Sequence, residues 1–111
     1  MLAYLLNVPT TPEEWAIWSR AHRDQHDQIN QAIQNVYGIN LTSYPIDPIA
    51  LDDFPDFLNA NQRLHNDFNG VLGTQGSDLT QADLTDTNQL EAWIYLHRRE
   101  HENAADILHL G

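Results

Sequence analysis

Three segments of this chain share one register of aromatic and polar residues, which constrains the fold more than any other feature of the sequence. When His26, His65 and His101 are aligned, each has an aromatic residue eight positions earlier and a histidine or asparagine four positions earlier. The aromatic residues are Trp18, Phe57 and Trp93, and the second polar set is His22, Asn61 and His97. Steps of four residues keep side chains on one face of an α-helix. The spacing therefore predicts three helices that each place polar side chains on the apolar, core-facing side.

The register recurs after 39 residues and again after 36, which is typical of a repeated supersecondary unit. Apolar residues follow at three and seven positions beyond each histidine, namely Ile29, Phe68 and Ala104, then Ile33, Leu72 and Leu108. We therefore expect a pseudo-threefold repeat with an aromatic layer, two polar layers and an aliphatic layer. Parallel and antiparallel helices both remain open, because the connectors are long enough to return along a helix.

Capping signals give the expected ends of these helices. Thr11-Pro12-Glu13-Glu14 is typical of a helix start, in which Thr11 caps the backbone and Glu14 reaches back to the cap. A second start follows Asp52, and Asp86 with Gln89 forms a third. Apolar residues on a helical period extend to Val36, and glycines at 38, 73 and 111 provide stops. We expect helices over residues 11–37, 53–72 and 87–109 of one all-α domain spanning 1–111.

The remaining segments are predicted to be ordered straps and an apolar arm. Residues 39–51 and 73–85 are rich in turn-forming residues, and Leu79 and Leu84 are expected to plug the core from the second strap. The N-terminal arm, residues 1–10, either packs on its own bundle or docks on a neighbouring subunit. We predict a partner-binding arm formed by Leu2, Tyr4, Leu5, Leu6 and Val8.

The charge balance excludes several classes of function. Sixteen acidic residues face five arginines and no lysine, which gives a net charge of −11. Such a chain repels the phosphate backbone, so we expect no direct nucleic-acid partner. Without lysine or cysteine, a lysine Schiff base, a P-loop lysine and a thiolate metal site are impossible. The longest apolar stretch is too short to cross a bilayer, so no membrane association is expected.

The histidine pairs allow two interpretations. His22 with His26, and His97 with His101, are each spaced to clamp one metal ion, and together they offer the four nitrogens of a tetrahedral zinc site. The favoured interpretation is a structural polar core without metal or cofactor. This core contains His22, His26, Asn61, His65, His97 and His101, with each ring hydrogen-bonded inside the bundle.

No motif predicts catalysis. His97-Arg98-Arg99-Glu100-His101 matches the inverted zinc-peptidase signature, but the repeat already explains its histidines. We interpret Glu100 as incidental, because Gln25 and Leu64 occupy the same position in the other segments. No serine lies in a nucleophile elbow, and Asp78 and Asp83 miss the EF-hand spacing. We therefore expect a protein that is not an enzyme and has no catalytic residue.

Three stretches carry a resemblance to a known group of proteins. Residues 12–29 (Pro-Glu-Glu-Trp, then Trp-Ser-Arg-Ala-His and His), 65–73 (His-Asn-Asp-Phe-Asn-Gly-Val-Leu-Gly) and 90–108 resemble small uncharacterised proteins of tailed bacteriophages. The resemblance implies a virion or morphogenesis protein and carries no activity. It implies residence in the virion, and in the host cytoplasm during assembly.

The first functional hypothesis is therefore a non-enzymatic structural or assembly component of a tailed-phage particle, at the capsid surface or neck. Its expected partners are capsid, portal or tail proteins, with a second copy of the chain as a further candidate. Two alternatives stay open. One is a histidine-rich helical metal-binding module, and the other is an acidic host-directed inhibitor that mimics nucleic acid.

Overall fold

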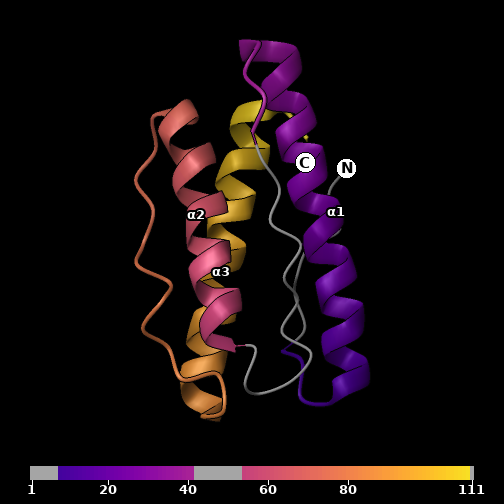
Figure 1. Cartoon of the computed structure of the whole chain (residues 1–111), viewed down its shortest axis with the longest axis vertical. Coiled ribbons are helices and arrows are strands. Elements are labelled where there is room, and N and C mark those ends of the chain that lie inside the picture. Colours follow the sequence, from indigo (N-terminus) through magenta and orange to yellow (C-terminus); the bar gives the residue numbers. More distant parts are fainter. Residues whose placement is uncertain (1–7, 42–53, 111) are drawn as a thin grey trace.

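The chain forms three α-helices in a computed structural model that describes residues 8–41 and 54–110. Helix α1 spans Pro12–Tyr37, α2 spans Phe54–Leu72 and α3 spans Thr87–Leu108 (Figure 1). The described ranges contain no β-strand. The prediction of an all-α, three-helix fold is confirmed, and each predicted helix boundary lies within one residue of the observed one.

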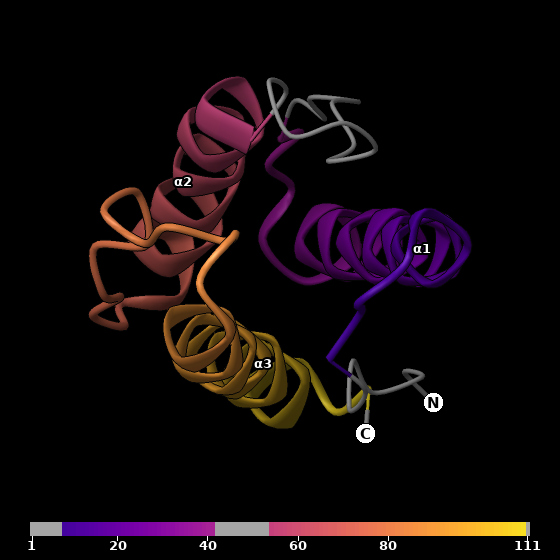
Figure 2. The ribbon, with the colours of Figure 1, turned by 90° about the horizontal axis from the view of Figure 1, so that it is seen from below.

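All three helices run in the same direction, which the sequence had left open. Equivalent levels meet across the bundle: the Trp18 ring centroid lies 5.8 Å from those of Phe57 and Trp93. One level further along, the His26 ring lies 5.2 Å from His65 and 4.6 Å from His101. Figure 2 shows the helices at the three corners of a triangle, seen along the bundle. Their apolar stripes therefore face one shared core.

Two apolar clusters occupy this core, one on each side of the polar layers. The N-terminal cluster contains Trp15, Trp18, Phe57, Leu58, Leu79, Leu84, Leu90, Trp93 and Ile94. The C-terminal cluster contains Ile29, Ile33, Phe68, Ala104 and Leu108. The expectation that Leu79 and Leu84 plug the core is confirmed, since both are buried. Val36, by contrast, is exposed, because the apolar stripe of α1 leaves the core after Ile33.

The helix ends follow their capping signals with three differences. Thr11 accepts the Glu14 backbone N–H as predicted, but the Glu14 carboxylate accepts from the backbone of Thr10 and does not reach the cap. Asp86 caps α3, yet the Gln89 side chain bonds to Asp83 instead of Asp86. Gly38 and Gly73 adopt positive φ angles of 70° and 71°, as expected for helix stops. Helix α3 is capped by His109, at φ 58°, and not by Gly111.

The connector, residues 73–86, returns along the outside of α2 and α3 (Figure 1). Its backbone is fixed by side chains of both helices: Leu79 N–H donates to Gln62 Oε1 at 2.8 Å, and Trp93 Nε1–H donates to Leu79 O at 2.9 Å. Asp78 and Asp83 each accept hydrogen bonds from the threonine two residues later, so they stabilise turns.

Two predicted segments fall largely outside the described residues. Of the N-terminal arm, Leu2, Tyr4, Leu5 and Leu6 lie outside them, whereas Val8 packs against the N-terminal cluster. Of the predicted strap at 39–51, only residues 39–41 are described. None of the described helices is both long enough and apolar enough to pass through a bilayer.

Candidate metal centre

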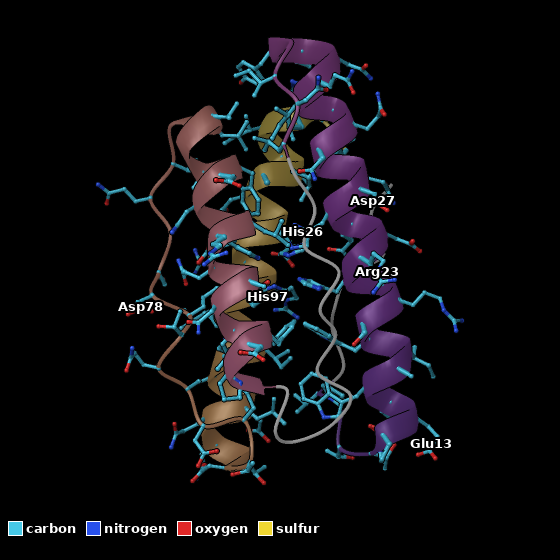
Figure 3. The ribbon with its side chains drawn as sticks, viewed as in Figure 1. Glu13, Arg23, His26, Asp27, Asp78 and His97 are labelled. Atoms are coloured by element: carbon cyan, nitrogen blue, oxygen red, sulfur yellow. The ribbon has the colours of Figure 1, made fainter. Side chains whose placement is uncertain are left out.

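Five imidazole side chains meet in the middle of the bundle. Helix α1 contributes His22 and His26, α2 contributes His65, and α3 contributes His97 and His101. All five are buried, as is Asn61, the sixth residue of the predicted polar core. In Figure 3, His26 and His97 point into the space between the helices, whereas Arg23 and Asp27 lie on the outer side of α1. The structure thus brings together every polar-core residue that the register predicted, and the four predicted metal-ligand candidates are among them.

The ring nitrogens of these histidines converge on one small region. One nitrogen from each of the five rings lies within 4.8 Å of the other four. The Nε2 atom of His22 is 2.9 Å from Nε2 of His26 and 3.2 Å from Nε2 of His97. The Oδ1 atom of Asn61 lies 3.0 Å from His22 Nε2 and 3.1 Å from His97 Nε2. Electron-pair donors from all three helices therefore face a common centre.

Aromatic rings cover this region from both ends of the bundle. The Trp18 indole stacks on His22 with centroids 4.7 Å apart, and the Trp93 indole stacks on His97 at 4.6 Å. On the other side, the Phe68 ring lies 4.7 Å from His65. These contacts fix the orientation of three imidazoles and surround the nitrogens with apolar groups. The centre is therefore shielded from bulk water, and electrostatic interactions within it are strong.

Two histidines are oriented by a partner on a neighbouring helix. His65 donates its Nδ1–H to Oε1 of Glu100 at 2.9 Å, and His101 donates its Nδ1–H to Oε1 of Gln25 at 2.9 Å. Each bond leaves the Nε2 lone pair free, which is the usual way that proteins prepare a histidine for metal binding. The interpretation of Glu100 as incidental is therefore wrong: its side chain is buried and orients a ring of the cluster.

Glu100 and Gln25 occupy the same place in the sequence register, immediately before His101 and His26. Each bonds to a histidine of a different helix and not to the histidine that follows it in the sequence. The third member of this position is Leu64, which has no acceptor, and His26 Nδ1 has no hydrogen-bond partner. The position before each histidine was therefore the sequence signal for these orienting residues. The signal is weak because one of its three members, Leu64, is apolar.

The Glu100 carboxylate is itself held by three donors. Besides His65, it accepts from Asn69 Nδ2 at 3.1 Å and from the Ser77 backbone N–H at 2.9 Å. The connector comes so close here that a Cβ on Gly76 would lie 2.4 Å from Asn69 Nδ2 and 2.9 Å from Glu100 Oε1. A glycine at position 76 thus permits the close approach that covers this carboxylate.

Burial keeps the five histidines neutral. Desolvation, followed by repulsion from His65, lowers the pKa of His22 to about 3. Desolvation also lowers the pKa values of His26, His97 and His101 well below the usual range, with neighbouring imidazoles adding to the effect. The pKa of His65 is lowered by burial, although Glu100 opposes the shift. For Glu100, burial opposes ionisation, but the hydrogen bonds from His65, the Ser77 backbone and Asn69 outweigh it and the pKa is lowered.

Several buried polar atoms of this centre have no hydrogen-bond partner. They include four ring nitrogens: His26 Nδ1, His65 Nε2, His97 Nδ1 and His101 Nε2. An unsatisfied buried polar atom costs about 1–3 kcal/mol. Each of the five rings has at least one hydrogen bond inside the bundle, as the polar-core interpretation predicts, but four of them leave one nitrogen unsatisfied. The Nε2 atoms of His65 and His101 remain available to a ligand.

The fold and the site together define a class: a parallel three-helix bundle with a buried five-histidine centre. No protein family, curated protein or solved structure matches this chain.

Proposed function

We propose that this protein binds one first-row transition-metal ion between its helices through the imidazoles of His22, His26, His65, His97 and His101. The observation that carries the proposal is the convergence of five ring nitrogens within 4.8 Å of one another in a buried centre. A metal–imidazole bond measures about 2.0–2.1 Å, so adjacent ligand nitrogens lie about 3 Å apart and opposite ones about 4 Å apart. The 2.9 and 3.2 Å separations of the Nε2 atoms match adjacent ligands. The widest separations, up to 4.8 Å, exceed the distance between opposite ligands, so those rings must move closer together when an ion binds.

The protonation states support the same function. A metal ligand must be a neutral imidazole with a free lone pair, and the lowered pKa values keep these rings neutral. The Nδ1–H groups of His65 and His101 are already engaged by Glu100 and Gln25. Binding an ion would satisfy the Nε2 atoms that otherwise have no partner.

A polar core without metal is the competing explanation. Short nitrogen–nitrogen contacts can be hydrogen bonds, because each neutral imidazole carries one N–H. His22 Nε2, however, has three neighbours within 3.2 Å, and in either tautomer it has only one hydrogen or one lone pair to share among them. The competing explanation also leaves His65 Nε2 and His101 Nε2 unsatisfied. One bound cation would remove both deficits.

The test is the metal content of full-length protein purified without an affinity tag and then dialysed. Mass spectrometry of the metals should find one transition-metal ion per chain. Removing an ion present at 1,000 times its Kd costs about 4 kcal/mol, so chelation should lower Tm by more than about 10 °C. Substoichiometric metal together with a Tm that chelation does not change would contradict the proposal.

Matched variants separate the buried centre from adventitious surface binding. His97→Gln removes a central ligand, whereas His109→Gln changes an exposed histidine outside the cluster. We expect the first variant to lose the ion and the second to retain one ion per chain.

The expected role in a tailed-phage particle stays a prediction, as does the acidic-inhibitor alternative. Metal binding is compatible with either role, because the ion would lie inside the bundle and leave its surface free for partners. Mass spectrometry of purified virions is the direct test of the first role. Absence of the chain from them would contradict it.

A further inference from the structure

Very little charge surrounds the five imidazoles. Within residues 8–41 and 54–110, Glu100 is the only buried side chain that carries a charge at neutral pH. Arg23 and Arg98 are next to His22 and His97 in the sequence, but neither is buried, and Arg98 pairs with Glu102 at 3.3 Å. The centre therefore has five neutral ligands and one negative charge.

With one carboxylate among neutral side chains, the core has no net charge only if the bound ion carries a single positive charge. A divalent ion with five neutral imidazoles and one carboxylate leaves one uncompensated positive charge in the core. A monovalent ion leaves none. Uncompensated charge in a protein interior is costly, since the surroundings cannot replace water. The Trp18, Trp93 and Phe68 rings around the cluster supply no compensating charge.

Ligand chemistry narrows the choice to one element. Imidazole suits zinc, copper, iron and nickel, and among these copper also has a stable monovalent state. We propose that the centre is selective for copper and holds it as Cu(I) on up to four of the five imidazoles, with Glu100 as the counter-charge that sets this selectivity. This inference rests on the proposed metal-binding function and goes further, because it names the ion, its charge and a selectivity-determining residue.

Glu100 acts through His65 and is not one of the groups whose atoms converge on the centre. Its Oε1 atom is 2.9 Å from His65 Nδ1, on the opposite side of that ring from the free Nε2. Gln25 is its neutral counterpart, with the same 2.9 Å bond to His101 Nδ1. The two side chains have nearly the same shape and differ by one charge.

Single substitutions at Gln25 and Glu100 give proteins with zero, one or two carboxylates beside the cluster. Glu100→Gln removes the charge and keeps an acceptor for His65, whereas Gln25→Glu adds a charge and keeps an acceptor for His101. A negative charge attracts a divalent ion twice as strongly as a monovalent ion at the same place. The ratio of the Zn(II) Kd to the Cu(I) Kd should therefore rise in the first variant and fall in the second.

The experiment is an anaerobic competition titration of the metal-free full chain, with a Cu(I)-specific chelator in one arm and a Zn(II) chelator in the other. We expect one Cu(I) per wild-type chain, bound at least 10-fold more tightly than Zn(II). The Kd ratio should shift about 10-fold upward in Glu100→Gln and about 10-fold downward in Gln25→Glu. Glu102→Gln, which removes a partly exposed carboxylate paired with Arg98, should change the ratio less than twofold.

Each outcome separates the two proposals. Tighter binding of Zn(II) than of Cu(I) would overturn the copper assignment but not metal binding. So would a Kd ratio that is unchanged in both Glu100→Gln and Gln25→Glu. Failure to bind either ion overturns both. The wild-type comparison requires no substitution, so the assignment remains testable if a variant does not fold.

Discussion

Glu100 joins the histidine cluster to the connector. Its carboxylate accepts hydrogen bonds from His65, Asn69 and the Ser77 backbone, which belong to α2 and to the segment that follows it. Burial opposes the charge of a carboxylate in this place, and the hydrogen bonds from its three donors favour it. The three donors therefore preserve the charge on which the ion preference depends.

Removing this carboxylate should destabilise the fold. In Glu100→Ala three buried or partly buried donors lose their acceptor, and we expect the free energy of unfolding to fall by about 2–3 kcal/mol. Glu102→Ala is the control, since its ion pair with Arg98 is partly exposed and should contribute less than about 1 kcal/mol. Urea unfolding of metal-free protein measures both changes. Equal losses in the two variants would show that Glu100 has no special place in the core.

A substitution at Leu64 tests whether the residue before each cluster histidine orients a histidine of another helix, as Gln25 and Glu100 do. In Leu64→Gln, the new amide oxygen can accept from His26 Nδ1, the ring nitrogen left without a partner. We expect a loss of stability below about 1 kcal/mol, because the new hydrogen bond offsets burial of the amide. Leu108→Gln, at a similarly buried position in the apolar C-terminal cluster, should cost about 2–4 kcal/mol. Thermal unfolding measures the loss of stability in both variants. Equal losses would contradict an orienting role for position 64.

The sequence predicted which histidines lie in the core, but it did not predict that Gln25 and Glu100 orient two of them. Four-residue spacing places His22 and His26 on one face whatever the neighbouring helices do. The bonds from Gln25 to His101 and from Glu100 to His65 depend on how the helices are rotated against one another. Spacing within one helix carries no such information.

Connector 73–86 makes the parallel arrangement of α2 and α3 possible. Parallel neighbours require a connection that travels the length of the bundle, and this one is fixed on its way by Gln62 and Trp93. The segment contacts the histidine cluster indirectly, through the bond from Ser77 to Glu100. Disturbing it should therefore affect both stability and metal binding.

Gly76→Ala tests this coupling. The added Cβ would lie 2.4 Å from Asn69 Nδ2 and 2.9 Å from Glu100 Oε1, so those groups must move and their hydrogen bonds weaken. We expect a loss of about 1–3 kcal/mol in stability, from the overpacking, and weaker metal binding. Gly70→Ala is the control: no atom lies within 4 Å of its Cβ, and alanine in α2 should stabilise by about 0.5–1 kcal/mol. Calorimetry measures the stability and the metal affinity of both variants. Equal changes in the two would contradict a coupling between the connector and the histidine cluster.

Helix limits were predictable and helix directions were not. The capping residues Thr11 and Asp86 and the glycine stops act within one or two turns, so the local sequence contains them. Direction is decided by which levels of the helices pack together. Both directions bury the same apolar stripes, and long connectors permit either.

The molecule as a whole has an acidic exterior around a centre of neutral bases. The net charge of −11 arises from residues that, apart from Glu100, are not buried in the described part of the chain. Five of the six histidines lie in the core instead. The pH of the medium should therefore act on the fold mainly through these rings.

Stability of the metal-free protein should fall as the pH drops below about 6.5, the pKa of unfolded histidine. The folded pKa values are lower, at about 3 for His22, so the unfolded state binds more protons in this window. Each such histidine removes up to about 1.4 kcal/mol per pH unit between its unfolded and folded pKa values. Glu100 adds to the loss at lower pH, because its pKa is also depressed. Chemical denaturation at pH 7.5, 6.5 and 5.5 measures the effect, and a flat profile would place the rings in contact with water.

The most direct test of the central claim is X-ray absorption spectroscopy of the copper-loaded protein at the copper edge. If the ion lies among His22, His26, His65, His97 and His101, the spectrum should fit three or four nitrogen ligands at about 2.0–2.1 Å, with the multiple-scattering pattern of imidazole rings. A spectrum dominated by oxygen ligands, or one with two imidazoles or fewer, would place the ion on the surface and contradict the account.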